Sequence, residues 1–194
     1  FPAAGILVEK IFSMDAAWAF TVAALLWVYL GIQKGQVTQD GLTGLNNRRR
    51  LDQYMWELDE RSGERETCCY LLMDVNKFKK VNDTYGHVTG DEVLRLVAEQ
   101  LKRTFGNMQA FLARYGGDEF VVIVKGKTQD EMDVIIHQTQ ENVNAIAWGA
   151  DTPWQLSISI GCAMRGEQGK QKSHELLALA DERMYRQKKG IQDR

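Results

Sequence analysis

The sequence contains little proline and cysteine, and neither sign of charge dominates it. It has 194 residues, with 2 prolines, 3 cysteines and a formal net charge of −2. So few prolines exclude collagen-like and proline-rich chains. A near-neutral charge argues against a general nucleic-acid-binding protein, which needs a basic surface to displace the counterions of the phosphates. We therefore expect no nucleic-acid partner.

The rest of the composition is typical of a folded protein. Hydrophobic residues make up 44% of the sequence and charged residues 26%, which argues against an intrinsically disordered chain. The length suits one globular domain, alone or with an appendage. Because the first residue is Phe1 rather than methionine, we expect further sequence upstream of it.

The cysteines and histidines form no metal or disulfide pattern that can be identified from their spacing. Cys68, Cys69 and Cys162 give neither a disulfide framework nor a CxxC pair. We expect all three to be reduced and structural. The 3 histidines are far apart in the sequence, so their spacing does not suggest a zinc site.

Residues 16–32 form an uncharged stretch, AAWAFTVAALLWVYLGI. As a helix this stretch would be about 26 Å long at about 1.5 Å per residue, near the about 30 Å of a bilayer core. Trp18 lies near one end and Trp27 near the other, where aromatic rings favour a membrane interface. We expect a membrane-spanning helix here; the alternative is a buried or dimer-forming helix packed on soluble partners.

The chain is expected to have two parts. Residues 1–39 would hold the N-terminal apolar, transmembrane helix and a short polar linker, and residues 40–194 would form one α+β domain. Basic residues that follow the apolar stretch, at Arg48, Arg49 and Arg50, place its C-terminal side in the cytoplasm.

Hydrophobic periodicity from residue 40 onward predicts alternating helices and strands. We expect helices over residues 51–61, 90–105, 130–147 and 173–189, and strands over residues 67–75, 109–114, 119–125 and 154–161. From residue 67 the order contains the βαββαβ pattern of a ferredoxin-like sheet. In such a sheet the first strand lies beside the hairpin that follows it.

Three carboxylates are expected to meet at one end of this sheet. Asp74 lies at the end of the first buried strand, and Asp118 and Glu119 follow Gly116 and Gly117 in the turn between the next two strands. Converging carboxylates suit Mg²⁺ or Mn²⁺, and two such ions can hold the attacking and leaving oxygens of a phosphoryl transfer. The alternative is an ordinary polar hairpin turn.

Residues 114–120 read RYGGDEF, which resembles the signature of the GGDEF family, the diguanylate cyclases. Other blocks resemble that family in the same order. They are DGLTGLNNRR at residues 40–49, MDVNKFKKVND at 73–83, GHVTGD at 86–91, SIG at 159–161 and the helix from Ala180 to Lys188. The resemblance covers about residues 40–189.

The resemblance implies a nucleotide-cyclase-like palm, an antiparallel sheet flanked by helices, which joins two GTP molecules into cyclic di-GMP and releases pyrophosphate. The 3′-hydroxyl of one GTP would attack the α-phosphate of the other. Each subunit would hold one GTP, so the enzyme would be a homodimer. With the apolar helix, this predicts a bacterial inner-membrane protein whose catalytic domain lies in the cytoplasm. A catalytically silent GTP-binding module and a nucleotide cyclase with another product are the alternatives.

The resemblance also assigns roles to individual residues. The ligands of Mg²⁺ (or Mn²⁺) would be Asp74, the Val75 carbonyl, Asp118 and Glu119. Glu119 would be either a further ligand or the base that helps to deprotonate the hydroxyl, and Asp118 and Glu119 are the expected catalytic pair. The substrate-binding residues would be Asn82 and Asp91 at the guanine, His87 beside them, and Phe78, Lys79 and Lys188 at the phosphates.

Simpler interpretations exist for several of these residues. Asp91 could be the N-cap of the helix over residues 90–105, and Asn82 could be part of a turn. His87 could be a surface histidine, and Lys188 could end a solvated helix.

The sequence departs from the family pattern at three places. Asn76 stands where an aspartate is frequent, and Gln192 where an arginine usually meets phosphate. The Arg-x-x-Asp of the family's product-inhibition site corresponds here to Asn107, Met108, Gln109 and Ala110. Because neither charge is present, we expect no product inhibition through that site.

Overall fold

The structure is a computed structural model, and it describes residues 17–28, 38–60, 67–148, 155–165 and 171–192. Residues 29–32 of the expected apolar helix, residues 33–37 of the expected linker and Trp154 lie outside the described residues. The chain divides into two compact units, Phe1–Val37 and Thr38–Arg194.

The expectation of a membrane-spanning helix is wrong. In the first unit the structure describes a helix over residues 17–28. Among the described residues, no helix has the length and apolar character needed to cross a membrane. This finding overturns the membrane anchor and the inner-membrane localisation that the sequence suggested.

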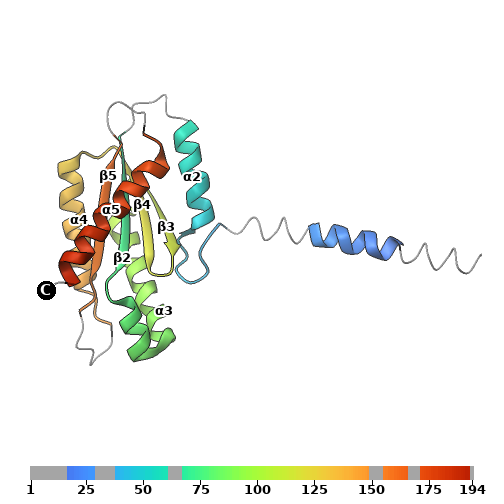
Figure 1. The fold of residues 1–194 in the computed structure, drawn as a ribbon, viewed down its shortest axis with the longest axis horizontal. Helices are drawn as coiled ribbons and strands as arrows, with labels where there is room; N and C mark the ends of the chain where they lie inside the picture. Colours follow the sequence, from blue (N-terminus) through green and yellow to red (C-terminus); the bar gives the residue numbers. More distant parts are fainter. Residues whose placement is uncertain (1–16, 29–37, 61–66, 149–154, 166–170, 193–194) are drawn as a thin grey trace, which may run out of the picture. The chain divides into compact units, whose positions relative to one another are not determined.

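The second unit is built on a five-stranded sheet (Figure 1). Its strands, in the spatial order β1-β3-β4-β2-β5, are β1 (Asn46–Asn47), β3 (Ala110–Gly116), β4 (Glu119–Lys125), β2 (Cys68–Val75) and β5 (Ile158–Met164). The short β1 is parallel to β3, and the other neighbours are antiparallel. β2 thus lies beside the β3–β4 hairpin through β4, as the sequence predicted.

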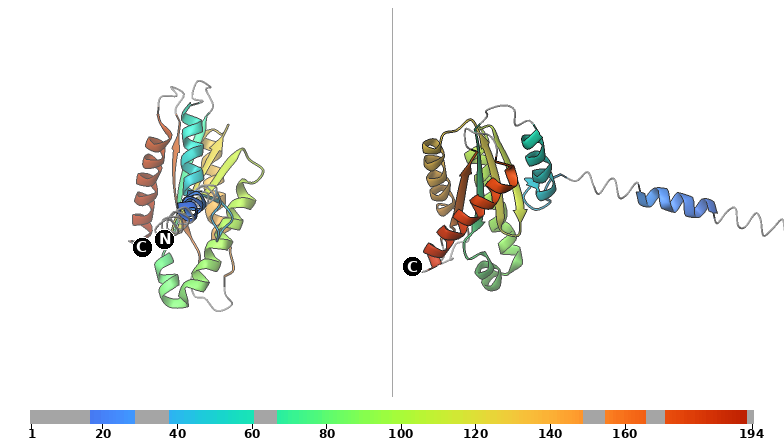
Figure 2. Two further views of the ribbon diagram at one scale, coloured as in Figure 1. Left: turned by 90° about the vertical axis from the view of Figure 1, so that its right-hand side faces the viewer. Right: turned by 45° about the horizontal axis from the view of Figure 1, so that its top comes forward.

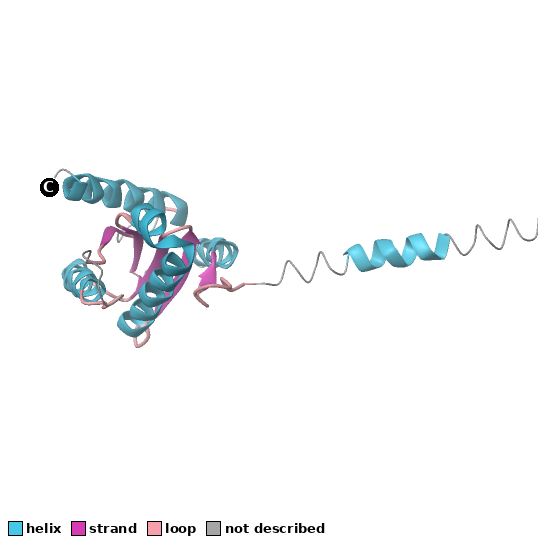
Figure 3. Ribbon diagram, turned by 90° about the horizontal axis from the view of Figure 1, so that it is seen from below, coloured by secondary structure: helices cyan, strands magenta, loops and turns pink. Residues whose placement is uncertain are grey.

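Four helices cover the two faces of this sheet (Figures 2 and 3). They are α2 (Arg48–Glu60), α3 (Phe78–Phe105), α4 (Gln129–Asn144) and α5 (Ser173–Gln192). α3 and α4 pack on one face in the larger core cluster, and α2 and α5 pack on the other face. Every residue of β2 is buried, because a central strand with helices on both sides has no solvated face.

Several elements differ from the expectation. No strand was expected at Asn46–Asn47, and α2 begins at Arg48 rather than at residue 51. α3 begins at Phe78 rather than at residue 90, and it is kinked at Gly86, whose φ of 82° is a conformation that glycine adopts readily. The sequence of this segment resembled a loop because the kink interrupts the helical periodicity. β5 begins at Ile158 and extends to Met164, because its pairing with β2 continues past Gly161.

Candidate active site

Asp74 and Glu119 face each other across two neighbouring strands. In the antiparallel register of β2 and β4, Asp74 is the direct partner of Glu119, so their side chains lie on the same face of the sheet. Asp118 occupies the hairpin turn just before Glu119, and its carbonyl accepts a hydrogen bond of 3.2 Å from the Val75 N–H. The fold therefore brings together the ends of the two strands that carry the three predicted carboxylates.

These carboxylates repel one another. Burial and the nearby Asp118 raise the pKa of Asp74, against the opposing effect of Lys188. Burial, followed by the charges of Asp74, Asp118 and Asp181, raises the pKa of Glu119. Because burial is the largest cause of both shifts, the raised pKa values mean that the fold disfavours the charged forms of these two carboxylates, and the neighbouring acids add to that effect.

Lys188 supplies a counter-charge to this cluster. Its Nζ, on α5, donates a hydrogen bond of 2.6 Å to Oδ1 of Asp74, a buried carboxylate. Lys188 is therefore not a solvated helix end. The sequence placed it at the substrate phosphates; the structure places it on Asp74, within the same group of charges.

The carboxylate set fits a divalent cation in its chemistry, although it is not gathered into a ready metal site. Among the described residues, no group of three or more His, Cys, Asp and Glu is arranged to hold a metal ion. However, Asp74 already binds one cationic group, Lys188, and Glu119 is surrounded by acids. Hard carboxylate oxygens are the ligands that Mg²⁺ and Mn²⁺ prefer, so these residues could hold such an ion after their side chains rearrange.

The glycine turn leaves open space beside these acids. Neither Gly116 nor Gly117 has a positive φ among the described backbone. A Cβ on Gly117 would meet nothing within 4 Å, and one on Gly116 would meet only Glu119 Oε2, at 3.6 Å. The fold itself therefore does not require glycine at Gly117, so its absence of a side chain keeps room for a ligand.

Arg114 ties this turn to the beginning of the domain. Its Nε and Nη2 donate to the Gly117 carbonyl at 3.0 and 2.7 Å, and its Nη1 donates to both carboxylate oxygens of Asp40 at 3.2 and 3.3 Å. Although burial acts to raise the pKa of Asp40, hydrogen bonds from Thr43 and Arg114 hold it below its ordinary value. No role was expected for Arg114 or Asp40, whose only signal in the sequence was that each belongs to a block that resembles the family.

Asn76 anchors the loop that follows β2. Its N–H donates to the Ser157 carbonyl at 2.9 Å, its Nδ2 donates to Ser157 Oγ at 3.0 Å, and its Oδ1 accepts from Ser159 Oγ at 2.7 Å. Lys77 follows with a φ of 57° just before α3. In the sequence Asn76 stands out only as a missing charge, and its anchoring role is not visible there because the two serines lie on a distant segment.

The predicted guanine-binding residues lie on both sides of the α3 kink. Asn82 and Asp91 are both inside α3, so Asn82 is not in a turn and Asp91 is not an N-cap. A Cβ on Gly90 would lie 1.9 Å from Asn82 Oδ1 and 3.3 Å from Phe78 Cζ. Gly90, which the sequence did not single out, therefore lets Asn82 and Phe78 pack close to the segment that carries Asp91.

Three predicted site residues are exposed in this structure. Lys79, His87 and Asp91 all lie at the surface of α3. Among the described residues, we identify no interaction between any of the three and the carboxylates.

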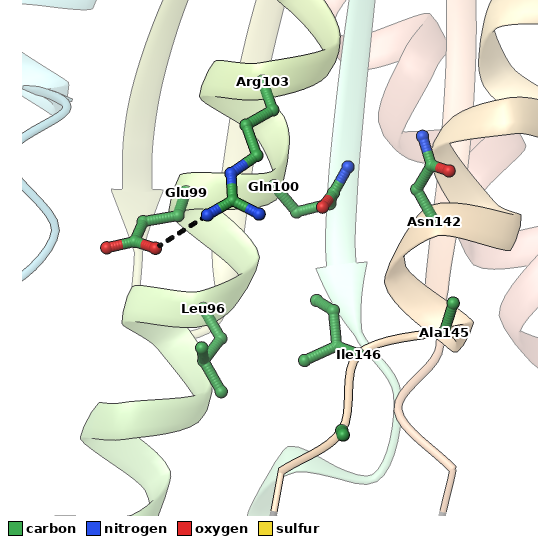
Figure 4. A pocket seen from close by; sticks show the side chains of 8 residues that line it. Leu96, Glu99, Gln100, Arg103, Asn142, Ala145 and Ile146 are labelled. Carbon is green, nitrogen blue, oxygen red and sulfur yellow. Dashed lines mark ion pairs between the residues drawn. The ribbon is translucent and has the colours of Figure 1, made fainter.

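A separate hollow lies between α3 and the end of α4 (Figure 4). Its volume is about 350 Å³, and its lining includes Leu96 and Ile146 together with an exposed ion pair of 3.8 Å between Glu99 and Arg103. None of the predicted site residues lines it. The hollow therefore does not belong to the carboxylate site.

Comparison with known proteins agrees with this arrangement. The family model described as "Diguanylate cyclase, GGDEF domain" matches residues 37–194. The probable diguanylate cyclase DgcI of Escherichia coli is 38% identical over 156 residues, which cover 78% of this chain and 31% of the relative. The diguanylate cyclase DgcP of Pseudomonas aeruginosa is 27% identical over 189 residues, which cover 97% of this chain and 27% of the relative. The chain thus spans less than half the length of these curated relatives.

A solved structure has the same fold. The coiled coil and GGDEF domain of DgcB from Caulobacter crescentus, in complex with c-di-GMP, is 28% identical with a TM-score of 0.74, covering 92% of this chain and 95% of that one. Since the family model matches most of the sequence, the chain belongs to the GGDEF domain family of diguanylate cyclases.

Proposed function

We propose that this chain is a diguanylate cyclase that condenses two GTP molecules into cyclic di-GMP and pyrophosphate, with residues 40–194 as its catalytic domain. The observation that carries the proposal is the pairing of Asp74 with Glu119 across β2 and β4, beside a glycine turn with open space. Membership of the family and similarity to curated diguanylate cyclases support it.

The carboxylates would bind the cation that the triphosphate needs. Asp74, Asp118, Glu119 and the Val75 carbonyl would hold Mg²⁺ or Mn²⁺, which would neutralise phosphate charge when bound. The raised pKa of Glu119 also suits a group that accepts the proton of the attacking 3′-hydroxyl. Asp118 would be the second catalytic acid, held in place through the turn that Arg114 fixes.

Residues of α3 and α5 would hold the nucleotide. Asn82 and Asp91 offer an amide and a carboxylate to the guanine edge, and His87 would lie beside them. For the phosphates, the backbone at Phe78 and Lys79 and the ammonium of Lys188 would supply donors. Lys188 pairs with Asp74 in this structure and would bind phosphate in the substrate complex.

Two copies of the chain would have to meet. Cyclic di-GMP is two-fold symmetric, and one site that holds a single GTP supplies only half of it, so two half-sites must face each other in a homodimer. The rate per enzyme should therefore fall as the protein is diluted toward the monomer.

The test is product identification by mass after incubation with GTP and Mg²⁺, with Asp118→Asn alongside. We expect cyclic di-GMP from the unchanged protein and at least about a 100-fold lower rate from Asp118→Asn. Asp52→Asn, an exposed change on α2, is the matched control and should leave the rate unchanged. GTP binding without turnover would identify a silent nucleotide-binding module instead, and a different product mass would identify another cyclase.

A further inference from the structure

Two cysteine sulfurs lie close together on neighbouring strands. Sγ of Cys69 on β2 is 3.0 Å from Sγ of Cys162 on β5. In the register of these strands Cys162 pairs with Leu71, and Cys69 pairs with Met164. The two cysteines are therefore diagonal neighbours, two positions apart on the same face of the sheet, which is within reach of side-chain contact.

The two thiols differ in accessibility and acidity. Cys69 is buried, whereas Cys162 is partly exposed. The hydrogen bond with Cys69, with help from Gln129 and the charge of Arg183, lowers the pKa of Cys162, and the same bond raises the pKa of Cys69. Since the thiolate is the reactive form of cysteine, Cys162 is the sulfur that would react first with an oxidant.

We propose that Cys69 and Cys162 form an oxidative modification site, at which a hydroperoxide converts the two thiols into a disulfide that joins β2 to β5. The Cys162 thiolate attacks one peroxide oxygen, the O–O bond breaks, and Cys162 becomes a sulfenic acid as hydroxide or water leaves. The Cys69 sulfur then attacks Cys162 and releases a second water. Two thiols and one hydrogen peroxide thus give one disulfide and two waters.

The two sulfurs already lie near bonding distance. A disulfide has an S–S length of about 2.05 Å, so the two sulfurs must approach by about 1 Å from their present 3.0 Å. Because the partners already lie on paired strands, the strand backbone can keep its register.

Cys68 is the natural control for this proposal. It is the sequence neighbour of Cys69 and equally buried, but it points to the opposite face of β2, into the core cluster shared with α2 and α5. Cys69 belongs to the other cluster, against which Cys162 packs. A reaction set by proximity would therefore use Cys69 and leave Cys68 unmodified.

The disulfide should stabilise the domain. Cys69 and Cys162 are 93 positions apart in the sequence, and a cross-link between distant positions restricts the unfolded chain strongly. We expect a rise in Tm of at least about 5 °C upon oxidation. This effect does not depend on the proposed catalytic function.

The experiment treats the reduced full chain with hydrogen peroxide, alkylates the remaining thiols under denaturing conditions and maps the peptides by mass. We expect a linked Cys69–Cys162 peptide, an alkylated Cys68, and a Tm increase that dithiothreitol reverses. Cys68→Ser should behave like the unchanged protein, and Cys162→Ser should form no link and show no Tm increase. Recovery of Cys69 and Cys162 unlinked, a disulfide that contains Cys68, or a link only between two chains would overturn the proposal.

Discussion

Lys188 donates a hydrogen bond of 2.6 Å to Asp74 across the interface between α5 and β2. This ammonium offsets only part of the burial and like-charge repulsion that raise the pKa values of Asp74 and Glu119. The metal-free protein therefore carries an electrostatic cost at the site proposed to bind a cation, and that cost can be measured.

Removing one carboxylate should stabilise the metal-free protein. A carboxyl group whose pKa is raised in the folded state contributes stability below its unfolded pKa and loses it as the pH rises through the folded pKa. We expect Glu119→Gln to raise Tm by a few degrees at pH 7 in EDTA, corresponding to at most about 1 kcal/mol because solvent screens the half-exposed Glu119. The advantage should vanish below about pH 4, where the carboxylates are protonated.

The same variant should respond less to metal. Mg²⁺ or Mn²⁺ should raise the Tm of the unchanged protein, because an ion that binds the folded state stabilises that state. The rise should be smaller for Glu119→Gln, which has lost one of the proposed metal ligands. Glu182→Gln, an exposed change on α5, serves as the control. A Glu119→Gln protein that is less stable than the unchanged one in EDTA at pH 7 would contradict this account of the site.

Arg114 should control the rate rather than the fold. Arg114→Lys keeps the positive charge, but its single ammonium cannot donate hydrogen bonds to Asp40 and to the Gly117 carbonyl at once, as the planar guanidinium does. If the glycine turn moves by about 1 Å, kcat should fall roughly 100-fold, with a smaller change in the KM for GTP. Steady-state kinetics measure both, with the exposed Arg95→Lys as the control. An unchanged kcat would show that the position of the glycine turn does not depend on the hydrogen bonds of Arg114.

The glycines of the site and of the core should respond differently to a methyl group. We expect Gly117→Ala to fold with a stability within about 0.5 kcal/mol of the original and to lose at least about 10-fold in rate, because the space beside it is left for substrate. Gly161→Ala should instead unfold the domain or cost about 3 kcal/mol or more, since its Cβ would lie 1.8 Å from the Ala180 carbonyl oxygen. Thermal unfolding and rate assays separate the two.

Gly41→Ala provides a matched control for Gly117→Ala. A Cβ at Gly41 also meets nothing within 4 Å, so the variant should keep both stability and rate. If Gly41→Ala and Gly117→Ala lose activity equally, the open space beside the acidic turn is not the cause.

The sequence predicted the parts of the fold that depend on local pattern. The buried strand β2 appears as a continuous apolar run and the β3–β4 hairpin as two strands around Gly116 and Gly117, so both could be identified without tertiary information. The meeting of Asp74 with Glu119 followed from the βαββαβ order. The start of α3 at Phe78 did not, because the kink at Gly86 interrupts the helical period.

Contacts between distant segments could not be predicted in this way. The bond from Lys188 to Asp74 joins residues 114 positions apart, and Asp40 and Arg114 are 74 positions apart. Hydrophobic periodicity reports which face of an element is buried, but it does not report which polar side chains meet across the packed elements. For the same reason the close packing of Gly90 on Asn82 became visible only in the structure.

Asn76 should act as a positioning residue for the loop between β2 and α3. Asn76→Ala removes its side-chain bonds to Ser157 and Ser159, so we expect the KM for GTP to rise several-fold with a smaller effect on kcat. Asn76→Asp keeps the acceptor for the Ser159 hydroxyl, and its second carboxylate oxygen can accept from the Ser157 hydroxyl in place of the lost amide donor, so it should restore much of the loss. Asn107→Ala, an exposed change, is the control. Equal loss in Asn76→Ala and Asn76→Asp would contradict the positioning role.

Product inhibition through the site before β3 should be absent, because neither charge of the family's inhibitory pair is present. Asn107 is exposed just before β3, whereas Ala110, the first residue of that strand, is partly buried against the larger core cluster. Initial rates should stay constant as cyclic di-GMP is added to the unchanged protein. In the double variant Asn107→Arg, Ala110→Asp, an arginine able to pair with the product's phosphates and a carboxylate able to accept from its guanine should produce inhibition. Inhibition of the unchanged protein by cyclic di-GMP below the enzyme concentration would show that another surface binds the product.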